Sequence, residues 1–300
     1  MMNNLDDEVG ARGDLDDGTA QDFLPLWRLT NEEYMAPHSS LRVYYYTIPE
    51  RVAVHWHEFY EMFFVVKGAG THVLNGTTYP LTPGSFFLLT PADFHEIAAR
   101  RGAILELYNV IFREDALEDA VHRLLFHEIM DYGTLYQGAD FAAMAAEFGR
   151  LWTEANERKA GYQRMMQGSL ERVLIELARR YLTRRGVAEP RPAVGRHAKV
   201  HQGLVYLHHH FREPLTLDRV AAHADLSPHY FSECFHKATG SSFQLYLRDL
   251  RLRFARSLLQ VADMPVTEIC YASGYATLSH FERAFKQKYG RSPRTYRRCG

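Results

Sequence analysis

The sequence predicts an α+β protein, in which an N-terminal β-barrel with flanking helices precedes a C-terminal all-α domain. Short segments rich in β-branched and aromatic residues, separated by tight turns, fill the region from Leu41 to Phe112. Helical periodicity follows from Asp115, and the last hundred residues contain one segment twice, offset by fifty positions. With 300 residues, 46% of them hydrophobic, the chain has room for about two domains with separate cores.

The first region has the composition of a β domain. Its strongest strand candidates are Arg42–Thr47, Met62–Lys67, Thr71–Leu74 and Ile104–Phe112. The dipeptide Asn75–Gly76 lies between Val73–Leu74 and Thr77–Tyr79, which predicts a hairpin. Several short strands joined by tight turns are typical of a β-barrel or jelly roll.

A long apolar stripe with helical spacing follows the β region. It consists of Tyr162, Met166, Leu170, Val173 and Leu177. One interpretation is that this helix covers the barrel, and the other is that it forms the seam of a homodimer. The two are compatible, since a helix can bury one face within its own chain and another against a partner.

The duplicated segment indicates a pair of helix-turn-helix units. Phe231 and Phe235 precede Gly240 in the first copy, and Phe281 and Phe285 precede Gly290 in the second. Each copy follows a short helical pattern and a turn. A helix-turn-helix places its second helix in the major groove of DNA, so two in tandem predict that one chain reads two stretches of groove.

Local signals define both units. In the first, Leu217–Ala224 is the supporting helix, Asp225–Leu226 is the turn, and Ser227 with Pro228 starts the second helix. The second unit repeats this order: Val266–Ser273 is the supporting helix, Gly274–Tyr275 the turn, and Thr277 the cap. A continuous helical pattern over Phe243–Val261 joins the two units.

The outward positions of the two second helices are the predicted DNA contacts. For the base edges we expect His229, Ser232, Glu233, Leu278, Ser279, Glu282 and Arg283. For the phosphates we expect Lys237, Thr277, Lys286, Arg291, Arg294 and Arg297.

Charge is distributed in agreement with a nucleic-acid partner. The chain as a whole has a net charge of -1, but residues 196–300 hold 16 Lys and Arg against 8 Asp and Glu. The C-terminal part is therefore at +8 and the remainder at −9. Two alternatives remain open. Similar helix patterns occur in bundles that never touch DNA, and a nucleoid-like architectural protein would bind DNA without sequence preference.

The segment Leu215–Arg297 resembles the AraC/XylS family of bacterial transcription regulators. The resemblance rests on "LTLDRVAAHADLSPHYFSECF", "RLRFARSLLQ" and "VTEICYASGYATLSHFERAFKQKYGRSPRTYR". It implies two helix-turn-helix units joined by a helix, promoter DNA as the partner of a homodimer, contact with RNA polymerase, and more often activation than repression. Glu233 and His236 depart from the family, which usually has basic residues there. The second unit is therefore the expected anchor on DNA.

A second cluster of polar residues lies in the β region. His55, His57, Glu61, Phe63 and Val65 share parity, so one extended strand would place them on one face. Imidazoles and a carboxylate, joined by His95, suit a divalent metal such as Zn, Fe, Mn or Ni. The spacing His-x-His-x3-Glu-x6-Gly resembles the first motif of cupins, and the region up to His95 loosely resembles the second, which implies a cupin-like sensor barrel.

Three interpretations of the barrel residues remain open. In the first, His55, Trp56, His57, Tyr60, Glu61 and His95 line a pocket for a small-molecule effector, with a sugar as one candidate. In the second, His55, His57, Glu61 and His95 bind the metal, in a metal-responsive regulator or in a metal-dependent cupin enzyme. In the third, they are polar core residues that pair with one another. We expect no catalytic residues and no enzymatic activity.

The sequence also predicts the domain bounds and the compartment. The bounds are an acidic disordered tail over 1–20, a cupin-like ligand-sensing barrel over 21–113, a helical dimerisation segment over 114–185, a linker over 186–198 and the double helix-turn-helix domain over 199–300. Three dispersed cysteines, with neither a signal peptide nor a membrane-length apolar run, predict a cytoplasmic, nucleoid-associated protein.

Overall fold

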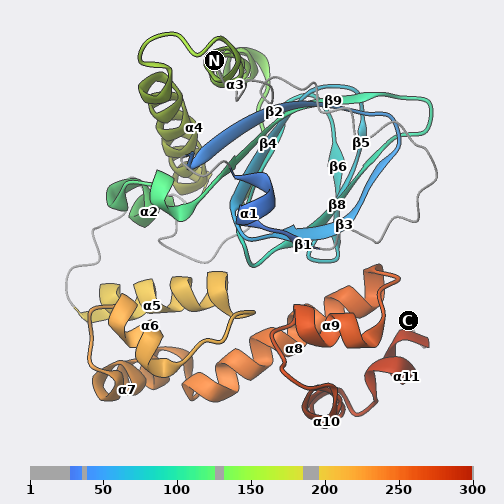
Figure 1. Ribbon diagram of the computed structural model, residues 1–300, viewed down its shortest axis with the longest axis vertical. Helices are drawn as coiled ribbons and strands as arrows, with labels where there is room; N and C mark the ends of the chain where they lie inside the picture. The colour runs from blue at the N-terminus through green and yellow to red at the C-terminus, as the bar shows by residue number, and fades with distance from the viewer. Residues whose placement is uncertain (1–27, 36–38, 126–131, 185–195, 299–300) are drawn as a thin grey trace, which may run out of the picture. The chain divides into compact units, whose positions relative to one another are not determined.

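The computed structural model describes residues 28–35, 39–125, 132–184 and 196–298, which form two compact units (Figure 1). The N-terminal unit is a β-barrel with helices, and the C-terminal unit is entirely helical. The predicted α+β fold class is confirmed. The tail predicted over 1–20 lies outside the described residues, as does most of the linker predicted over 186–198.

Two five-stranded sheets build the N-terminal unit, in the orders β1-β3-β8-β5-β6 and β10-β7-β4-β9-β2. The strands are β1 (Arg28–Leu29), β2 (Leu41–Ile48), β3 (Arg51–His57), β4 (Tyr60–Lys67), β5 (Gly70–Leu74), β6 (Thr77–Leu81), β7 (Ser85–Leu89), β8 (Phe94–Ala99), β9 (Leu105–Phe112) and β10 (Tyr132–Leu135). The unit also contains α1 (Asn31–Tyr34), the 3-10 turn η1 (Glu114–Ala116), α2 (Asp119–Leu125), α3 (Gly138–Glu157) and α4 (Tyr162–Arg184).

The predicted hairpin forms between β5 and β6. Asn75 and Gly76 both have positive φ, 51° and 85°, which is the backbone conformation that the tight turn between antiparallel strands requires. The expectation of one continuous strand from His55 to Val65 is wrong. β3 ends at His57 and β4 begins at Tyr60 in the other sheet, so the chain crosses from one sheet to the other between them.

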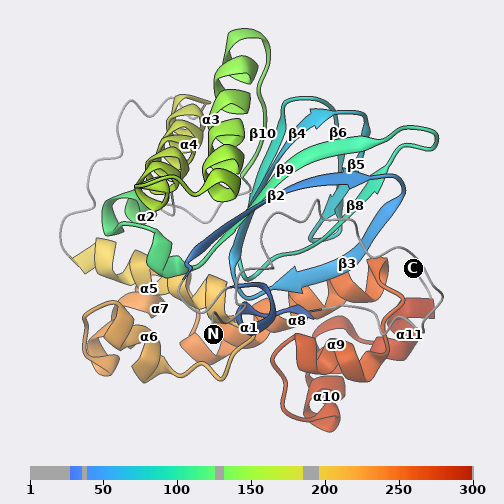
Figure 2. The ribbon, with the colours of Figure 1, turned by 45° about the horizontal axis from the view of Figure 1, so that its top comes forward.

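Apolar side chains fill the space between the two sheets. Phe63 and Val65 from β4 pack there with Phe87 from β7, and all three are almost fully buried. The outer face of the second sheet is covered by α3, which contacts β2, β4 and β9 (Figure 2). Phe148 of α3 stacks on Phe64 of β4, with 5.3 Å between ring centroids.

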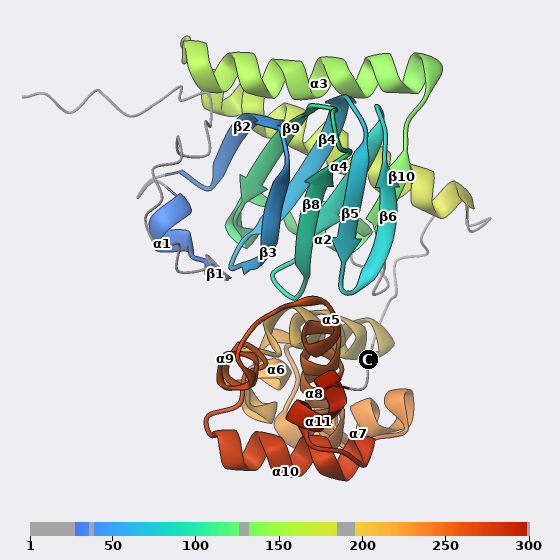
Figure 3. The same cartoon turned by 90° about the vertical axis from the view of Figure 1, so that its right-hand side faces the viewer.

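Helix α4 packs against α2 and α3, and Figure 3 shows α3 lengthwise beside the strands, with α4 partly hidden behind them. This packing corrects the predicted dimer seam. Met166, Leu170, Val173 and Leu177 are all at most 6% exposed within a single chain, so they cannot offer a surface to a partner. Their helical stripe was recognised correctly, but it serves intramolecular packing. Tyr162 is half-buried.

The C-terminal unit consists of seven helices within the described residues. They are α5 (Arg196–His210), α6 (Leu217–His223), α7 (Pro228–Thr239), α8 (Phe243–Val261), α9 (Val266–Ala272), α10 (Leu278–Tyr289) and α11 (Pro293–Arg298). Thr216, Ser227 and Ser242 each accept a hydrogen bond from a backbone amide in the first turn of the helix that follows. None of the helices in the described ranges is long and apolar enough to cross a membrane.

Both turns have the predicted backbone. Asp225 and Gly274 adopt positive φ, 50° and 81°, at the points where the supporting helices α6 and α9 end. The phenylalanine pairs of the duplicated segment, Phe231 with Phe235 and Phe281 with Phe285, are fully buried. Each pair forms the apolar core on which one second helix rests, so the opposite face of that helix lies outward.

Candidate functional site

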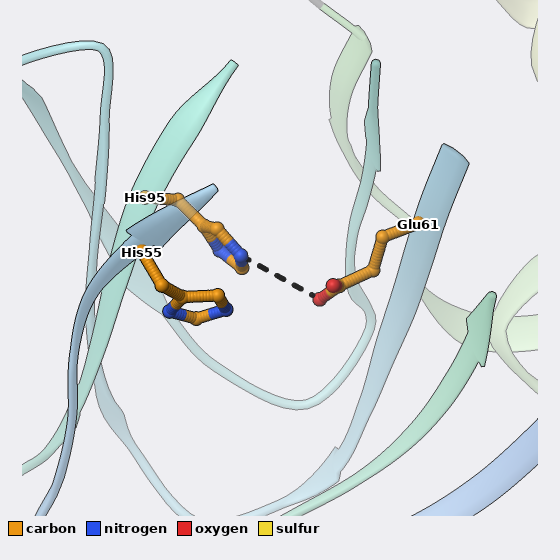
Figure 4. A group of neighbouring side chains, drawn as sticks. All are labelled: His55, Glu61 and His95. Atoms are coloured by element: carbon orange, nitrogen blue, oxygen red, sulfur yellow. Dashed lines mark ion pairs between the residues drawn. The ribbon is translucent and has the colours of Figure 1, made fainter. Parts of the chain in front are cut away.

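The polar cluster of the barrel is assembled across the two sheets. His55 of β3 lies directly opposite His95 of β8 in the strand register. Glu61 comes from β4 in the facing sheet, and Figure 4 shows its carboxylate directed at the two imidazoles. The side chains of His55, His57, Glu61 and His95 are all at most 8% exposed. Residues from three strands therefore meet inside the barrel.

The distances bring several potential ligand atoms together. Glu61 Oε1 lies 3.7 Å from His95 Nε2, and Glu61 Oε2 lies 3.6 Å from His57 Nε2. One ligand atom each of His55, Glu61 and His95 lies within 4.8 Å of the others. In the part of the chain that the structure describes, this is the one cluster with such spacing.

Hydrogen bonds fix the orientation of these side chains. Asn109 Nδ2 donates to Glu61 Oε1 over 2.9 Å. Nδ1 of His55 lies 2.8 Å from the carbonyl oxygen of Ala53, and Nδ1 of His57 lies 2.6 Å from that of Phe59. Each imidazole therefore has one nitrogen engaged by the barrel wall.

Burial determines the protonation of the cluster. Burial raises the pKa of Glu61 to about 7, although the hydrogen bond from Asn109 acts in the opposite direction. Burial lowers the pKa of His55, and it lowers that of His95 well below the ordinary value, so burial favours the neutral form of both rings. Neutral imidazoles present lone pairs, and Nε2 of His95 has no hydrogen-bond partner in the described structure. Such a set of atoms suits a divalent cation or a ligand rich in hydroxyl groups.

Two of the predicted pocket residues do not join the cluster. Trp56 lies between His55 and His57 on β3, and Tyr60 precedes Glu61 on β4, so strand alternation turns both to the opposite face. Tyr60 stacks instead on Phe112, with 5.4 Å between ring centroids. The prediction that these two aromatic rings face an effector inside the barrel is therefore wrong.

Four residues that were not predicted from the sequence also face the interior. His72 of β5 lies beside His95, and Asn109 of β9 lies beside Glu61. Tyr44 and Tyr46 of β2 pack against interior clusters, and their rings stack at 5.4 Å with an angle of 7° between planes. The alternation of Tyr44 and Tyr46 along one strand could have indicated that both face the same side of the sheet. The presence of a polar residue, Asn109, in the largely apolar segment Leu105–Phe112 could have indicated a role in the site.

A second candidate site lies on the outward face of α7 and α10. On α10, Ser279, Arg283 and Lys286 are exposed, while Leu278 and Glu282 are half-buried. On α7, His229, Glu233 and Lys237 are exposed and Ser232 is half-buried. Every predicted base-contacting residue is therefore accessible at the surface of the C-terminal unit.

The predicted phosphate contacts differ in their surroundings. Thr277, Arg291 and Arg294 are exposed. Arg297 is half-buried, and its guanidinium donates to the carbonyl oxygen of Met264. This bond gives Arg297 a structural role, since it ties α11 to the segment before α9.

Two family models match the chain. Residues 39–174 match an AraC-like ligand binding domain, and residues 220–299 match a helix-turn-helix domain. The first match spans the barrel from β2 onward, α2, α3 and about half of α4, and the second begins within α6 and spans the tandem helix-turn-helix segment.

Curated relatives match most of the chain. The HTH-type transcriptional activator RhaS of Escherichia fergusonii is 28% identical over 246 residues, which are 81% of this chain and 86% of that protein. RhaS of Salmonella schwarzengrund is 29% identical over 248 residues, with the same coverage of 81% and 86%.

Two solved structures are also similar. The DNA-binding domain of AdpA, a global transcriptional factor in complex with a target DNA, is 26% identical and covers 34% of this chain and 91% of its own, with a TM-score of 0.33. ToxT from Vibrio cholerae, with an unsaturated fatty acid bound, is 13% identical and covers 87% of this chain and 95% of its own, with a TM-score of 0.41.

Proposed function

This chain belongs to the AraC family of transcription regulators, and we propose that it activates transcription from promoter DNA under the control of a small molecule bound in its barrel. The observation that carries the proposal is the presence of a ligand-binding domain and a DNA-binding domain in one chain. The protein is not an enzyme, since its domains and relatives are those of a regulator. Activation is supported by the relatives, which are transcriptional activators.

We place the DNA contacts on the outward faces of α7 and α10. Arg283 is positioned to bind a guanine edge with two hydrogen bonds, and Ser279 to contact neighbouring bases. Lys286, Arg291 and Arg294 supply charge for the phosphates. Glu233 of α7 adds a negative charge, so α10 is the stronger anchor.

A sugar is our first candidate for the effector class. Its hydroxyl groups would find acceptors and donors at His55, Glu61 and Asn109, and the rings of Tyr44 and Tyr46 offer apolar faces. The effector must bind the DNA-competent state more tightly than the other state, because equal affinity for both would not change the equilibrium between them.

Selection from a pool of randomised duplexes tests DNA recognition with the full-length protein. We expect enrichment of one two-part motif over random competitor. Recovery of duplexes without a shared motif would contradict sequence-specific recognition and favour an architectural protein. A panel of sugars is then titrated against the selected duplex. The effector proposal requires at least one sugar to change the dissociation constant, and a panel without any effect excludes sugars as the class.

A homodimer in the cytoplasm that contacts RNA polymerase completes the proposed function. Because the inner stripe of α4 is buried, the dimer surface has to use the outer side of the unit, where Met165 is 43% exposed. Sedimentation of the full-length chain with and without Met165→Glu tests this surface. We expect the variant to shift from dimer to monomer, and an unchanged dimer would place the interface elsewhere.

The barrel cluster supports a second candidate, a metal-responsive regulator. The specific observation is the convergence of His55, Glu61 and His95 within 4.8 Å, with His57 facing Glu61. A bound divalent metal would neutralise the carboxylate and fix the two sheets relative to each other. Metal analysis of protein purified without chelator tests the candidate, and a stoichiometry near zero after incubation with Zn, Ni, Mn and Fe would reject it.

A further inference from the structure

The three imidazoles that surround Glu61 are each held through Nδ1. For His55 and His57 the partner is a backbone carbonyl oxygen, of Ala53 at 2.8 Å and of Phe59 at 2.6 Å. A carbonyl oxygen only accepts, so both rings must carry their proton on Nδ1. Their Nε2 atoms therefore bear the lone pairs. The hydrogen bonds to the two carbonyl oxygens thus fix the tautomer that can bind a cation.

His95 is held differently. Its Nδ1 faces Nε2 of His72 over 3.2 Å, not a carbonyl oxygen. An imidazole nitrogen can donate or accept, so this contact has two possible polarities. In one, the proton of His72 is on its Nδ1, for which the described residues offer no hydrogen-bond partner, and Nε2 of His95 carries a lone pair toward Glu61. In the other, Nε2 of His95 carries the proton and cannot bind a metal. The state of His72 therefore decides what His95 offers to the cluster.

The position of His72 is fixed by its surroundings. It is fully buried on β5, next to β8 in the sheet. Its ring stands edge-on to Phe63 and Phe87, with centroids 5.0 Å and 4.4 Å away. Aromatic contacts on this scale hold the ring in one orientation, which keeps Nε2 directed at His95.

We propose that His72 is the positioning residue for His95: it accepts a hydrogen bond from Nδ1–H of His95 and so keeps the Nε2 lone pair of His95 available to a divalent metal. This role rests on the metal-responsive function proposed above. His72 would do for His95 what the carbonyl groups of Ala53 and Phe59 do for His55 and His57. Partners of this kind, one bond removed from the metal, orient the ring and increase its basicity.

A matched pair of substitutions separates the acceptor from the shape of the side chain. His72→Phe keeps a ring among Phe63 and Phe87 but removes the acceptor. His72→Gln retains an acceptor in its amide oxygen. Zn and Co affinities are measured for both variants and the original chain by competition with a chelator, and Co absorption reports the ligand geometry. Thermal unfolding of the metal-free proteins establishes that each variant is folded.

We expect His72→Phe to weaken metal binding by about 10–100-fold and to alter the Co spectrum, and His72→Gln to stay within a few-fold of the original chain. Equal affinities and spectra for His72→Phe and the original chain would overturn the role of His72 while leaving the metal function in place.

A second measurement does not depend on metal. Long-range ¹⁵N–¹H correlation spectra of the metal-free full-length chain report which nitrogen of His95 is protonated. We expect Nδ1 in the original chain and in His72→Gln, and a shift of the proton to Nε2 in His72→Phe. An original chain that binds no metal but shows this tautomer change would reject the metal function and support the positioning role. A tautomer that is the same in all three proteins would overturn the positioning role.

Discussion

Gly203→Ala should destabilise the C-terminal unit, although alanine favours helices more than glycine does. Gly203 lies inside α5, where its missing side chain makes room for Phe231 of α7. A Cβ at this position would lie 2.4 Å from Cε2 and 2.7 Å from Cζ of the Phe231 ring. Since carbon atoms pack at about 3.5–4.0 Å, the ring would have to move by roughly 1 Å. Phe231 is fully buried, so the residues packed around its ring leave little room for this movement.

Two opposing effects set the magnitude. Replacing a helical glycine by alanine stabilises by about 1 kcal/mol. Overpacking a filled core costs about 1–3 kcal/mol, and the short distances at Phe231 place this site near the upper end. We therefore expect a net destabilisation of about 1–2 kcal/mol. We also expect weaker DNA binding, because Phe231 supports α7, the second helix of the first helix-turn-helix unit.

Gly168→Ala is the matched control. Gly168 also lies inside a helix, α4, but the nearest atom to its added Cβ is the flexible Nη1 of Arg172 at 3.5 Å. Only the helix preference remains, so this variant should gain about 0.5–1 kcal/mol. The two substitutions are chemically identical and should have opposite signs.

The assay uses the distribution of tryptophan. All three tryptophans precede the C-terminal unit in the sequence, and the two within the described residues, Trp56 on β3 and Trp152 on α3, belong to the N-terminal unit. The fluorescence of these two follows unfolding of the N-terminal unit. Circular dichroism adds the signal of the C-terminal helices. In urea, we expect the midpoint of the C-terminal transition to fall by about 1 M for Gly203→Ala. A midpoint that stays or rises would refute the packing argument at Phe231.

Three further outcomes are expected. Arg283→Ala should cost roughly 1–3 kcal/mol on the selected duplex and relax the preference at one base pair, so a binding-site selection with an unchanged motif would reject its base contact. Lys286→Ala should weaken binding to selected and random duplexes equally, and a loss confined to the selected duplex would contradict a phosphate contact. Burial, and secondarily Arg253, lower the pKa of His208 to about 4, and its Nε2 shares a hydrogen bond of 2.8 Å with the Tyr246 hydroxyl. The stability that the neutral His208 contributes is therefore complete above about pH 6.5. It is lost as the pH falls toward 4, and the free energy of unfolding decreases by up to about 3 kcal/mol. His208→Gln should flatten this part of the stability–pH curve, as measured by urea unfolding.

The C-terminal unit was predictable because its signals are local. A serine cap before Pro228, a residue with positive φ at Asp225, and glycine at 274 each act within a few residues of the chain. The bounds of α7 and α8 follow directly from such signals. The strands of the barrel were harder to predict, because strands such as Ser85–Leu89 are buried on both faces and lack the alternation of polar and apolar residues that identifies a strand.

The barrel cluster was predicted in part. The spacing of His55, Glu61 and His95 was sufficient to propose that they meet, even though the strand expected to join the first two does not exist. His72 was missed because its closeness to His95 depends on the pairing of β5 with β8, which no local pattern contains. Trp56 was misplaced because adjacent residues of a strand face opposite sides.

Helix α8 has a consequence for the operator. Arg251 donates to the carbonyl oxygens of Phe211 and Glu213, each over 2.7 Å, and Asp249 pairs with Lys288 of α10 over 2.9 Å. These contacts fix the orientation of the two helix-turn-helix units relative to each other within the C-terminal unit. One extra base pair between the two DNA segments that these units bind rotates the second segment by roughly 35° around the duplex axis. Insertions and deletions in that spacer should accordingly silence the promoter more severely than substitutions of the spacer bases.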